Sequence, residues 1–293
     1  MSKSTLYSLL FVAGGLWGLT IPVTKVSVST GYQPFGLIFW QLAVSIVLLS
    51  ILIKMRGKSL RLPPEMVGMM AIVGIVGTII PNSFSYQAAV HLPAGILAII
   101  IAMVPMFALP IAILIGRETP EIRRIAGVLV GGIAVILIVA PSANLPEPGQ
   151  AFYVLLALVG PLCYGAEGNY VAWRGTGSLD AMQLLFGASV IALILIAPVV
   201  WSSGQFITPF KIWTIADWAI LLNGGLHAGA YSLYIWLVGR AGAVFTSQVS
   251  YLVTGSGVLW SMVLLSENYS AWIWASLALM LVGLALVQPK RAS

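Results

Sequence analysis

Ten long stretches of mainly apolar residues follow one another along this chain of 293 residues. A helix needs about 20 such residues to cross the hydrocarbon core of a bilayer. Each stretch therefore predicts one transmembrane helix. The ten are expected near residues 5–29, 34–53, 65–90, 93–115, 122–140, 151–173, 179–201, 213–238, 242–265 and 271–288.

The composition excludes a soluble domain. Apolar residues make up 60% of the chain, charged residues only 8%, and the mean hydropathy is +1.02. A soluble domain carries charge on about a quarter of its residues. The excess of basic residues does not indicate nucleic-acid binding, because the chain lacks the soluble surface that a basic face requires. We therefore expect an all-α membrane protein with the lipid bilayer as its surroundings.

The second half of the chain repeats the plan of the first. An apolar run that starts at Ala94 leads to a charged turn at Glu118, and 149 residues later the same plan returns at Ala243 and Glu267. Weak internal symmetry of this kind is typical of transporters built from two repeats. We expect one five-helix repeat in residues 1–145 and a second in residues 146–293. Because five is odd, the two repeats would insert in opposite orientations.

The distribution of basic residues predicts the orientation. If the N-terminus is cytoplasmic, the other side receives a single loop cation, Lys211. The cytoplasmic side then receives Lys3, Lys54, Arg56, Lys58, Arg61, Arg117, Arg123, Arg124, Arg174, Arg240, Lys290 and Arg291. Such loops are enriched in Lys and Arg on the cytoplasmic side. We expect a multi-pass protein of a bacterial inner membrane with both termini in the cytoplasm.

Polar residues that recur at helical spacing predict a cavity, because polar side chains are unfavourable on a helix face that contacts lipid. The clearest stripe, in 213–238, carries Asn223, His227 and Tyr231, with Tyr234 beyond them. The segment 65–90 has a similar stripe. Other candidates are adaptable methionines, aromatic residues beside glycines, and polar groups in 242–265. The expected substrate-binding residues are Trp17, Thr78, Asn82, Tyr86, Met103, Met106, Tyr164, Asn223, His227, Tyr231, Gln248 and Tyr251.

Several of these residues have a structural alternative. Polar groups in a helix bundle often only bond a neighbouring helix, contributing about 0.6 kcal/mol. Glu167 is expected to pair with Arg174 or Arg240, and Lys25 to reach toward the outer surface. His227 would then be the titratable group at mid-depth, which predicts facilitated export with a modest pH effect.

The sequence carries no sign of an enzyme. It has two histidines, His91 and His227, and no paired carboxylates at mid-depth in a helix. It also lacks the Gly-x-x-x-x-Gly-Lys-Ser/Thr phosphate loop of nucleotide-driven pumps. We therefore expect neither a metal site, nor a cofactor, nor catalysis.

The chain resembles the EamA branch of the drug/metabolite transporter superfamily over its whole length. The resemblance is carried by the two sets of five helices, by Trp17-Gly18, by Pro105 in the fourth helix and by Glu118 after it. Within the branch it looks most like the YddG-type exporters of aromatic and other amino acids. The resemblance implies that helices 1, 3, 4, 6, 8 and 9 surround a central cavity. Ser266 stands before Glu267 where the family usually has Gly.

The expected function is export of amino acids, aromatic and other neutral ones, or of similar small amphipathic metabolites. The mechanism would be alternating access in a monomer. A zwitterionic substrate would find donors and acceptors on Asn82, Asn223, His227 and Gln248. The alternatives are a passive pore and a drug or toxic-cation efflux protein. A pore is disfavoured because the sequence shows neither a ring of like charges nor a carbonyl filter motif.

Overall fold

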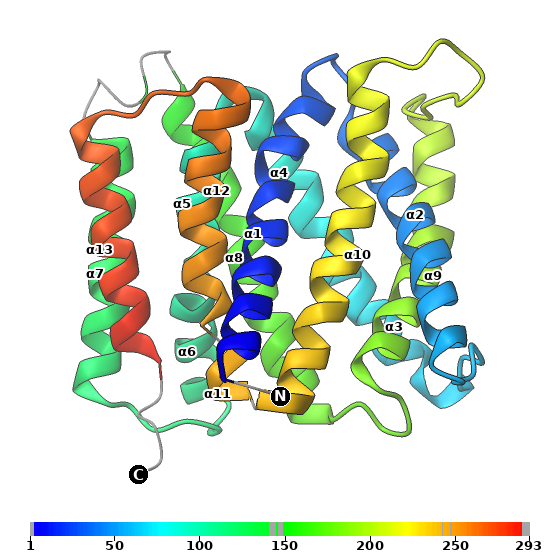
Figure 1. Ribbon diagram of the computed structural model, residues 1–293, viewed down its shortest axis with the longest axis horizontal. Helices are drawn as coiled ribbons and strands as arrows, with labels where there is room; N and C mark the ends of the chain where they lie inside the picture. The colour runs from blue at the N-terminus through cyan, green and yellow to red at the C-terminus, as the bar shows by residue number, and fades with distance from the viewer. Residues whose placement is uncertain (1–2, 141–144, 146–148, 242, 247, 289–293) are drawn as a thin grey trace.

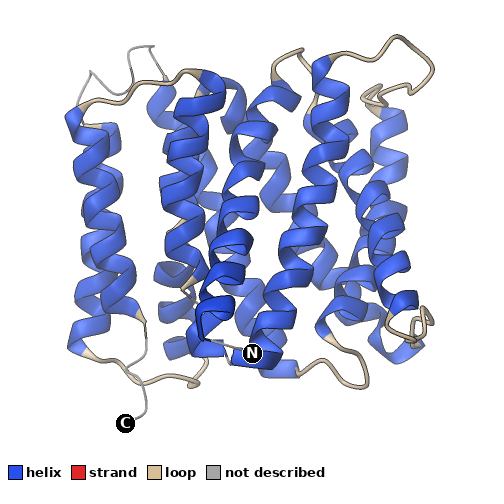
Figure 2. Cartoon of the chain, viewed as in Figure 1, coloured by secondary structure: helices blue, strands red, loops and turns tan. Residues whose placement is uncertain are grey.

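The computed structural model describes residues 3–140, 145, 149–241, 243–246 and 248–288. Within these residues all regular structure is helical (Figure 2). The ten segments expected from hydropathy are confirmed as helices, with their ends shifted by at most a few residues. They are α1 (Lys3–Val28), α2 (Pro34–Met55), the run of η1 (Pro64–Met66), α3 (Val67–Gly74), η2 (Ile75–Ile79) and α4 (Ile80–His91), the broken pair α5 (Ala94–Ile101) and α6 (Val104–Leu114), α7 (Ile122–Val139), α8 (Gln150–Arg174), α9 (Ala181–Ser202), α10 (Ile215–Ala241), the pair α11 (Ala243–Thr246) and α12 (Val249–Leu265), and α13 (Ala271–Val287).

The helices are long and apolar enough to cross a membrane. Seven of the described segments meet this condition at 18 residues or more, and α12 and α13 are shorter apolar helices. All run roughly parallel to one axis (Figure 1). The expected boundary between the two repeats, at residues 145 and 146, falls in a connection of which 141–144 and 146–148 lie outside the described residues.

Both ends of the described chain lie on one side of the bundle. Helix α1 begins and α13 ends at the lower edge in Figure 1. We call the side with these two helix ends the terminal side, and the side with the α4–α5 and α12–α13 connections the far side. These two names are used below for the directions of access.

Close helix packing determines the shape of the bundle. Helix α1 packs against α10 and α12, α2 and α3 pack against α9, α4 and α6 pack against α8, and α7 pairs with α13. In the α7–α13 pair, a Cβ added at Gly127 would lie 2.8 Å from the carbonyl oxygen of Gly283. Where α1 crosses α12, a Cβ added at Gly18 would lie 2.8 Å from the backbone nitrogen of Gly257. Glycine is therefore needed at these crossings, as is common between membrane helices.

Two prolines interrupt the helices that face the centre. Pro81 has no N–H and cannot donate to the carbonyl four residues earlier, and the five residues before Ile80 form the π-helix η2. Pro105 lies in the first turn of α6, just after α5 ends at Ile101. Irregular backbone of this kind is tolerated at membrane depth where it lies inside protein or lines a cavity.

A loop contact fixes the start of α9 on the terminal side. Asp180 accepts a hydrogen bond from the backbone N–H of Gln183, whose side chain accepts one from the backbone N–H of Asp180, so the two form a capping box. Lys58 and Arg56 lie 2.7 and 3.1 Å from the same carboxylate. Partial burial opposes ionisation, but the hydrogen bonds from Lys58 and Gln183 and the nearby cations outweigh it and lower the pKa of Asp180.

Candidate functional site

The centre of the bundle contains a cavity of about 860 Å³. Its walls come from α1, α2, η2, α4, α5, α6, α7, α8, α10, α12 and α13. This volume lies within the range of about 300–1,000 Å³ that is usual for small-molecule sites. The cavity is therefore the candidate substrate site.

Seven of the twelve expected residues line this cavity. They come from five different helical segments, so the fold brings together side chains that are far apart in the sequence. The seven are Trp17, Thr78, Asn82, Tyr86, Tyr164, Asn223 and His227.

A polar network connects α2, α4 and α8 on one wall. The phenol of Tyr164 donates to Oδ1 of Asn82 at 3.3 Å, and the amide nitrogen of Asn82 donates to Oε1 of Gln41 at 3.4 Å. The Tyr86 hydroxyl donates to the same oxygen of Gln41. A shared acceptor holds both donors in place, and buried polar groups that are satisfied by one another specify a single arrangement. The wall therefore presents fixed amide and phenol groups to the cavity.

A second polar contact joins α10 to α1. The amide nitrogen of Asn223 donates to Oγ1 of Thr24 at 3.1 Å. One turn further along α10, the His227 ring meets the Trp17 ring edge-on, with the ring centroids 6.0 Å apart. The stripe expected along 213–238 thus faces α1, and three of its members, Asn223, His227 and Tyr234, line the cavity.

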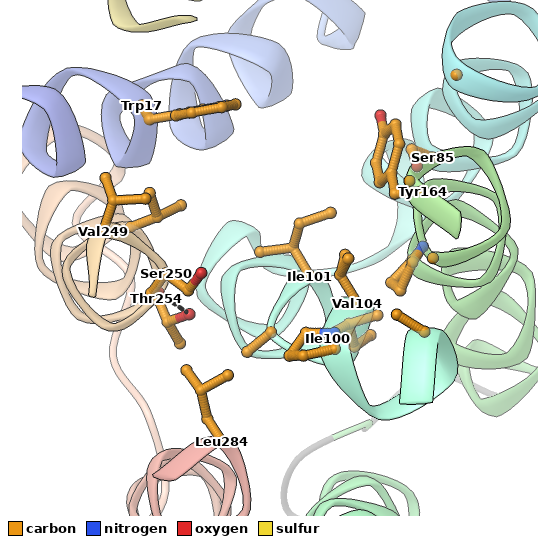
Figure 3. Close-up of a pocket in the computed structure, with 18 of the residues that line it drawn as sticks. Trp17, Ser85, Ile100, Ile101, Val104, Tyr164, Val249, Ser250, Thr254 and Leu284 are labelled. Atoms are coloured by element: carbon orange, nitrogen blue, oxygen red, sulfur yellow. Dashed lines mark hydrogen bonds between the residues drawn. The ribbon is translucent and has the colours of Figure 1, made fainter. Parts of the chain in front are cut away.

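The remaining wall is apolar and aromatic. Figure 3 shows Trp17 on one side of the open space and Tyr164 with Ser85 across from it. Ile101 and Val104, on either side of the break between α5 and α6, project between them. The cavity therefore has polar groups at several points and a broad apolar surface between them.

Five expected residues do not line the cavity: Met103, Met106, Tyr231, Gln248 and Tyr251. Met103 and Met106 are buried in the core beside α7, where a Cβ added at Gly131 would lie 2.0 Å from the sulfur of Met106. The break before α6 turns these side chains away from the centre. The expected methionine wall is therefore replaced by α5 and α6 residues such as Ile101.

The other three lie next to the cavity or outside it. Tyr231 packs edge-on against Trp17, with centroids 6.4 Å apart, and supports this ring from behind. Gln248 lies at the start of α12 as its capping residue. Tyr251 packs against the buried core cluster around Ile99.

Several lining residues were not among the expected ones. Gln41 is the hub of the polar network, and Thr24 is the partner of Asn223. The signal for Gln41 was available, since it is the one amide in the middle of the apolar stretch 34–53. Glu118 and Arg124 also line the cavity and form an ion pair at 2.8 Å.

The cavity extends to the terminal side. The Glu118–Arg124 pair lies at the start of α7, and Gln288 follows the end of α13. Arg124 also donates to the carbonyl of Val287 at 2.9 Å. The start of α7 and the end of α13 lie at the terminal edge of the bundle (Figure 1). The lining thus runs from mid-depth to this edge.

Lys25 closes part of the far side. Its Nζ donates to the carbonyls of Ala89, Val90 and Leu92 at 2.6, 3.1 and 2.8 Å. Ala89 and Val90 belong to the last turn of α4, whose carbonyls lack partners within the helix, and Leu92 is the residue that caps it. The charge also complements the negative end of the helix dipole. Lys25 therefore joins α1 to α4 instead of extending freely to the surface.

Glu267 joins the α12–α13 connection to α5 on the same side. Its carboxylate accepts hydrogen bonds from the backbone N–H groups of Ala94 and Gly95 at 2.9 and 3.2 Å. Tyr269 donates to Glu267 and accepts from the N–H of Gly95. Burial and the neighbouring Glu267 carboxylate raise the pKa of Tyr269, so it remains a neutral donor. The far side is thus held closed at two places while the terminal side leads into the cavity.

A membrane bundle with a mixed polar and apolar cavity, reached from one side and closed at the other, is the architecture of a membrane transporter. The family model of the EamA-like transporters matches residues 5–140 and 151–288. The chain therefore belongs to the EamA-like transporter family.

Individual proteins support the same assignment. The chain is 26% identical over 290 residues to the "Uncharacterized inner membrane transporter YedA" of Escherichia coli K12, an alignment that covers 96% of this chain and 90% of that protein. Proteins of the same name in the O6:H1 and O157:H7 strains match equally. A crystal structure matches with a TM-score of 0.65 at 18% identity and covers 97% of this chain and 96% of its own, which shows a shared fold.

Proposed function

We propose that the protein exports amino acids, aromatic and other neutral ones, or similar small amphipathic metabolites, across a bacterial inner membrane by alternating access. The observation that carries the proposal is the central cavity, in which fixed amide and phenol groups face an aromatic and aliphatic wall. The inner-membrane location is supported by the apolar helices and by the name of the E. coli relative.

The chemistry of the cavity suits an amino acid. The amides of Asn82 and Asn223 and the phenol of Tyr164 offer donors and acceptors for an ammonium and a carboxylate group. Trp17 and Ile101 offer an apolar surface on which an aromatic or aliphatic side chain can be buried. Each contact replaces water that the substrate loses on entry.

The closed far side supports alternating access over a passive pore. A pore requires a continuous opening, whereas Lys25 and Glu267 here join helices on the far side. We assign the terminal side to the cytoplasm, as the basic loops predict. Residues 1–145 and 146–293 would be the two inverted units whose relative movement opens the far side, within a single monomer.

A counterflow screen in proteoliposomes tests the function. Vesicles loaded with one unlabelled compound are offered trace radiolabel of the same compound, for a panel of neutral and aromatic amino acids and one quaternary ammonium dye. Accumulation of an amino acid label supports the proposal. Counterflow of the dye alone would favour drug efflux, and leak that neither saturates nor shows counterflow would favour a pore.

A matched pair of variants connects transport to the cavity. Tyr164→Phe removes a hydroxyl that lines the cavity, so that a polar group of the bound substrate loses its partner at a cost of about 1–3 kcal/mol. The half-saturating concentration should rise about 5- to 150-fold. Tyr7→Phe removes a hydroxyl from an exposed ring on the outer face of α1 and should leave transport unchanged.

A further inference from the structure

Glu167 is an acidic side chain far inside a membrane-spanning helix. It lies seven residues before the end of α8 at Arg174, about 10 Å from the terminal edge at 1.5 Å per residue. The other described acidic residues lie in connections or within the first residues of a helix. Ionisable groups at membrane depth are costly, and those that are present usually serve ion or substrate pathways.

No ion pair or hydrogen bond to Glu167 is present among the residues that the structure describes. The expected pairing with Arg174 or Arg240 is absent there, because each guanidinium lies over a tryptophan ring instead. Arg174 is 5.7 Å from the centroid of Trp173, and Arg240 is 5.6 Å from that of Trp236. The charge of Glu167 therefore lacks a compensating cation within the described chain.

The carboxyl group of Glu167 lies against the wall of the cavity. A Cβ added at Gly77 would be 2.6 Å from its carboxyl carbon and 2.7 Å from each carboxyl oxygen. Gly77 lies in the π-helix η2, and both Gly77 and the next residue, Thr78, line the cavity. Glu167 is not itself one of the lining residues, but its carboxyl group abuts a lining glycine that has no side chain. Turns of π-helix occur frequently at functional sites.

The surrounding titratable groups do not supply a positive charge. Those in electrostatic contact with Glu167 are Cys163 and Tyr164 of its own helix and Tyr231 of α10. Of the elements packed against α8, the segments α3, η2, α5 and α6 carry no titratable residue. Helix α4 carries Tyr86, which bonds Gln41, and His91, which stacks on Tyr153.

We propose that Glu167 is the proton-binding site that couples export to a proton gradient, with the carboxyl group holding a proton when the cavity is empty and the ammonium group of an amino acid when it is occupied. An isolated carboxylate ion at this depth is strongly disfavoured, so one of the two positive partners must be present. Because both occupy the same carboxylate, binding of one weakens binding of the other.

This competition makes the protein an antiporter. The carboxylic acid loses its proton to water on the terminal side as the ammonium group takes its place. After export the carboxylate regains a proton from the far side before the empty carrier returns. The inference rests on the proposed function, and it replaces the facilitated export that was expected while His227 was the mid-depth titratable group.

The first experiment detects the proton site without any substrate. Infrared difference spectra of the protein in liposomes, recorded across a pH series, should show a carboxylic C=O band that titrates. The band should be missing in Glu167→Gln and present in Glu65→Gln, which removes an exposed carboxylate on the surface. A band that persists unchanged in Glu167→Gln overturns the assignment.

The second experiment measures coupling with L-phenylalanine, or with whichever amino acid shows counterflow. In vesicles held at zero membrane potential, with a lumen one pH unit more acidic than the medium, exchange of one proton per zwitterionic substrate allows up to about a tenfold accumulation. The wild type and Glu65→Gln should approach this value. Glu167→Gln should stay near one and show weaker counterflow, because it lacks the group that binds both the proton and the substrate ammonium. Counterflow without any response of the wild type to the gradient would overturn proton coupling and leave the proposed function intact. Absence of counterflow for every amino acid would instead overturn the proposed function, and the infrared result would still decide whether Glu167 binds a proton.

Discussion

The contact of Glu267 with the start of α5 should hold the far side closed, and Glu267→Gln tests this directly. The carboxylate accepts the N–H groups of Ala94 and Gly95, which are among the first groups of α5 and have no partner within the helix. Glutamine keeps one acceptor oxygen of similar reach and removes the charge. The change therefore weakens the contact without removing the side chain.

The magnitude follows from the two bonds that the carboxylate makes. A hydrogen bond to a charged group contributes about 1.5–3 kcal/mol and a neutral one about 0.5–1.5 kcal/mol. Glu267 is half-buried, so solvent screening reduces the difference. We take the loss as about 1–2 kcal/mol, which shifts the equilibrium toward the far-side-open state by about 5- to 30-fold.

Thiol labelling in intact cells measures this shift. A single cysteine at Leu97, which lines the cavity one turn into α5, is exposed to a membrane-impermeant maleimide. The labelling rate should rise 5- to 30-fold in Glu267→Gln. The control is Asn268→Ala, a neighbour whose side chain bonds the carbonyl of Ser266. Equal labelling in Glu267→Gln and its parent, or an equal rise in the control, would refute the role of this contact.

Three further outcomes are expected. His227→Ala should weaken apparent affinity about tenfold to hundredfold with a normal size-exclusion profile, because the ring lies on the cavity wall. Leu222→Ala, on the exposed face of the same helix, should transport normally. Aggregation of His227→Ala alone would show that the stripe serves helix packing. Asp180→Ala should lower the free energy of unfolding by about 0.5–2 kcal/mol through loss of the α9 cap. The folded-state pKa of Asp180 is lowered, so the stability that its carboxylate contributes is present above the unfolded pKa near 4 and is lost as pH falls through the folded pKa. The denaturation midpoints of the wild type and Asp180→Ala should therefore converge in acid. Single cysteines at Lys58 and Phe210 in a cysteine-free background should label from the cytoplasm and from outside respectively, and labelling of both from one face would contradict the topology.

The helix segments could be predicted because the bilayer sets their length. A spanning helix must be about 20 apolar residues long, so the hydropathy of the chain marks each one. The ends follow from local chemistry, as between α1 and α2, where Gly31 has a φ of 82° and Pro34 begins the next helix. Neither signal depends on which helices are neighbours, so a single sequence is enough to predict the helix segments and their ends.

The cavity residues could be predicted only where a helix is continuous. Along α10, the 3.6-residue period carries Asn223 and His227 onto the same wall, as expected. Across the break before Pro105 that period no longer applies, so Met103 and Met106 point toward α7. The sequence shows that a proline interrupts the helix, but the rotation of the second half depends on tertiary packing.

Isolated polar residues were the hardest to interpret, because their meaning depends on partners from other helices. Gln41 is the one amide in α2, and it accepts from Asn82 and Tyr86 of α4. Glu167 was given an expected partner on the assumption that a buried charge must be paired nearby, and the structure places the available arginines on tryptophans instead. Burying an unpaired charge costs free energy, so a carboxylate that has no cation from the described chain must obtain one from outside the chain. A proton and a substrate ammonium group are the two cations that a transporter cavity can bring to it.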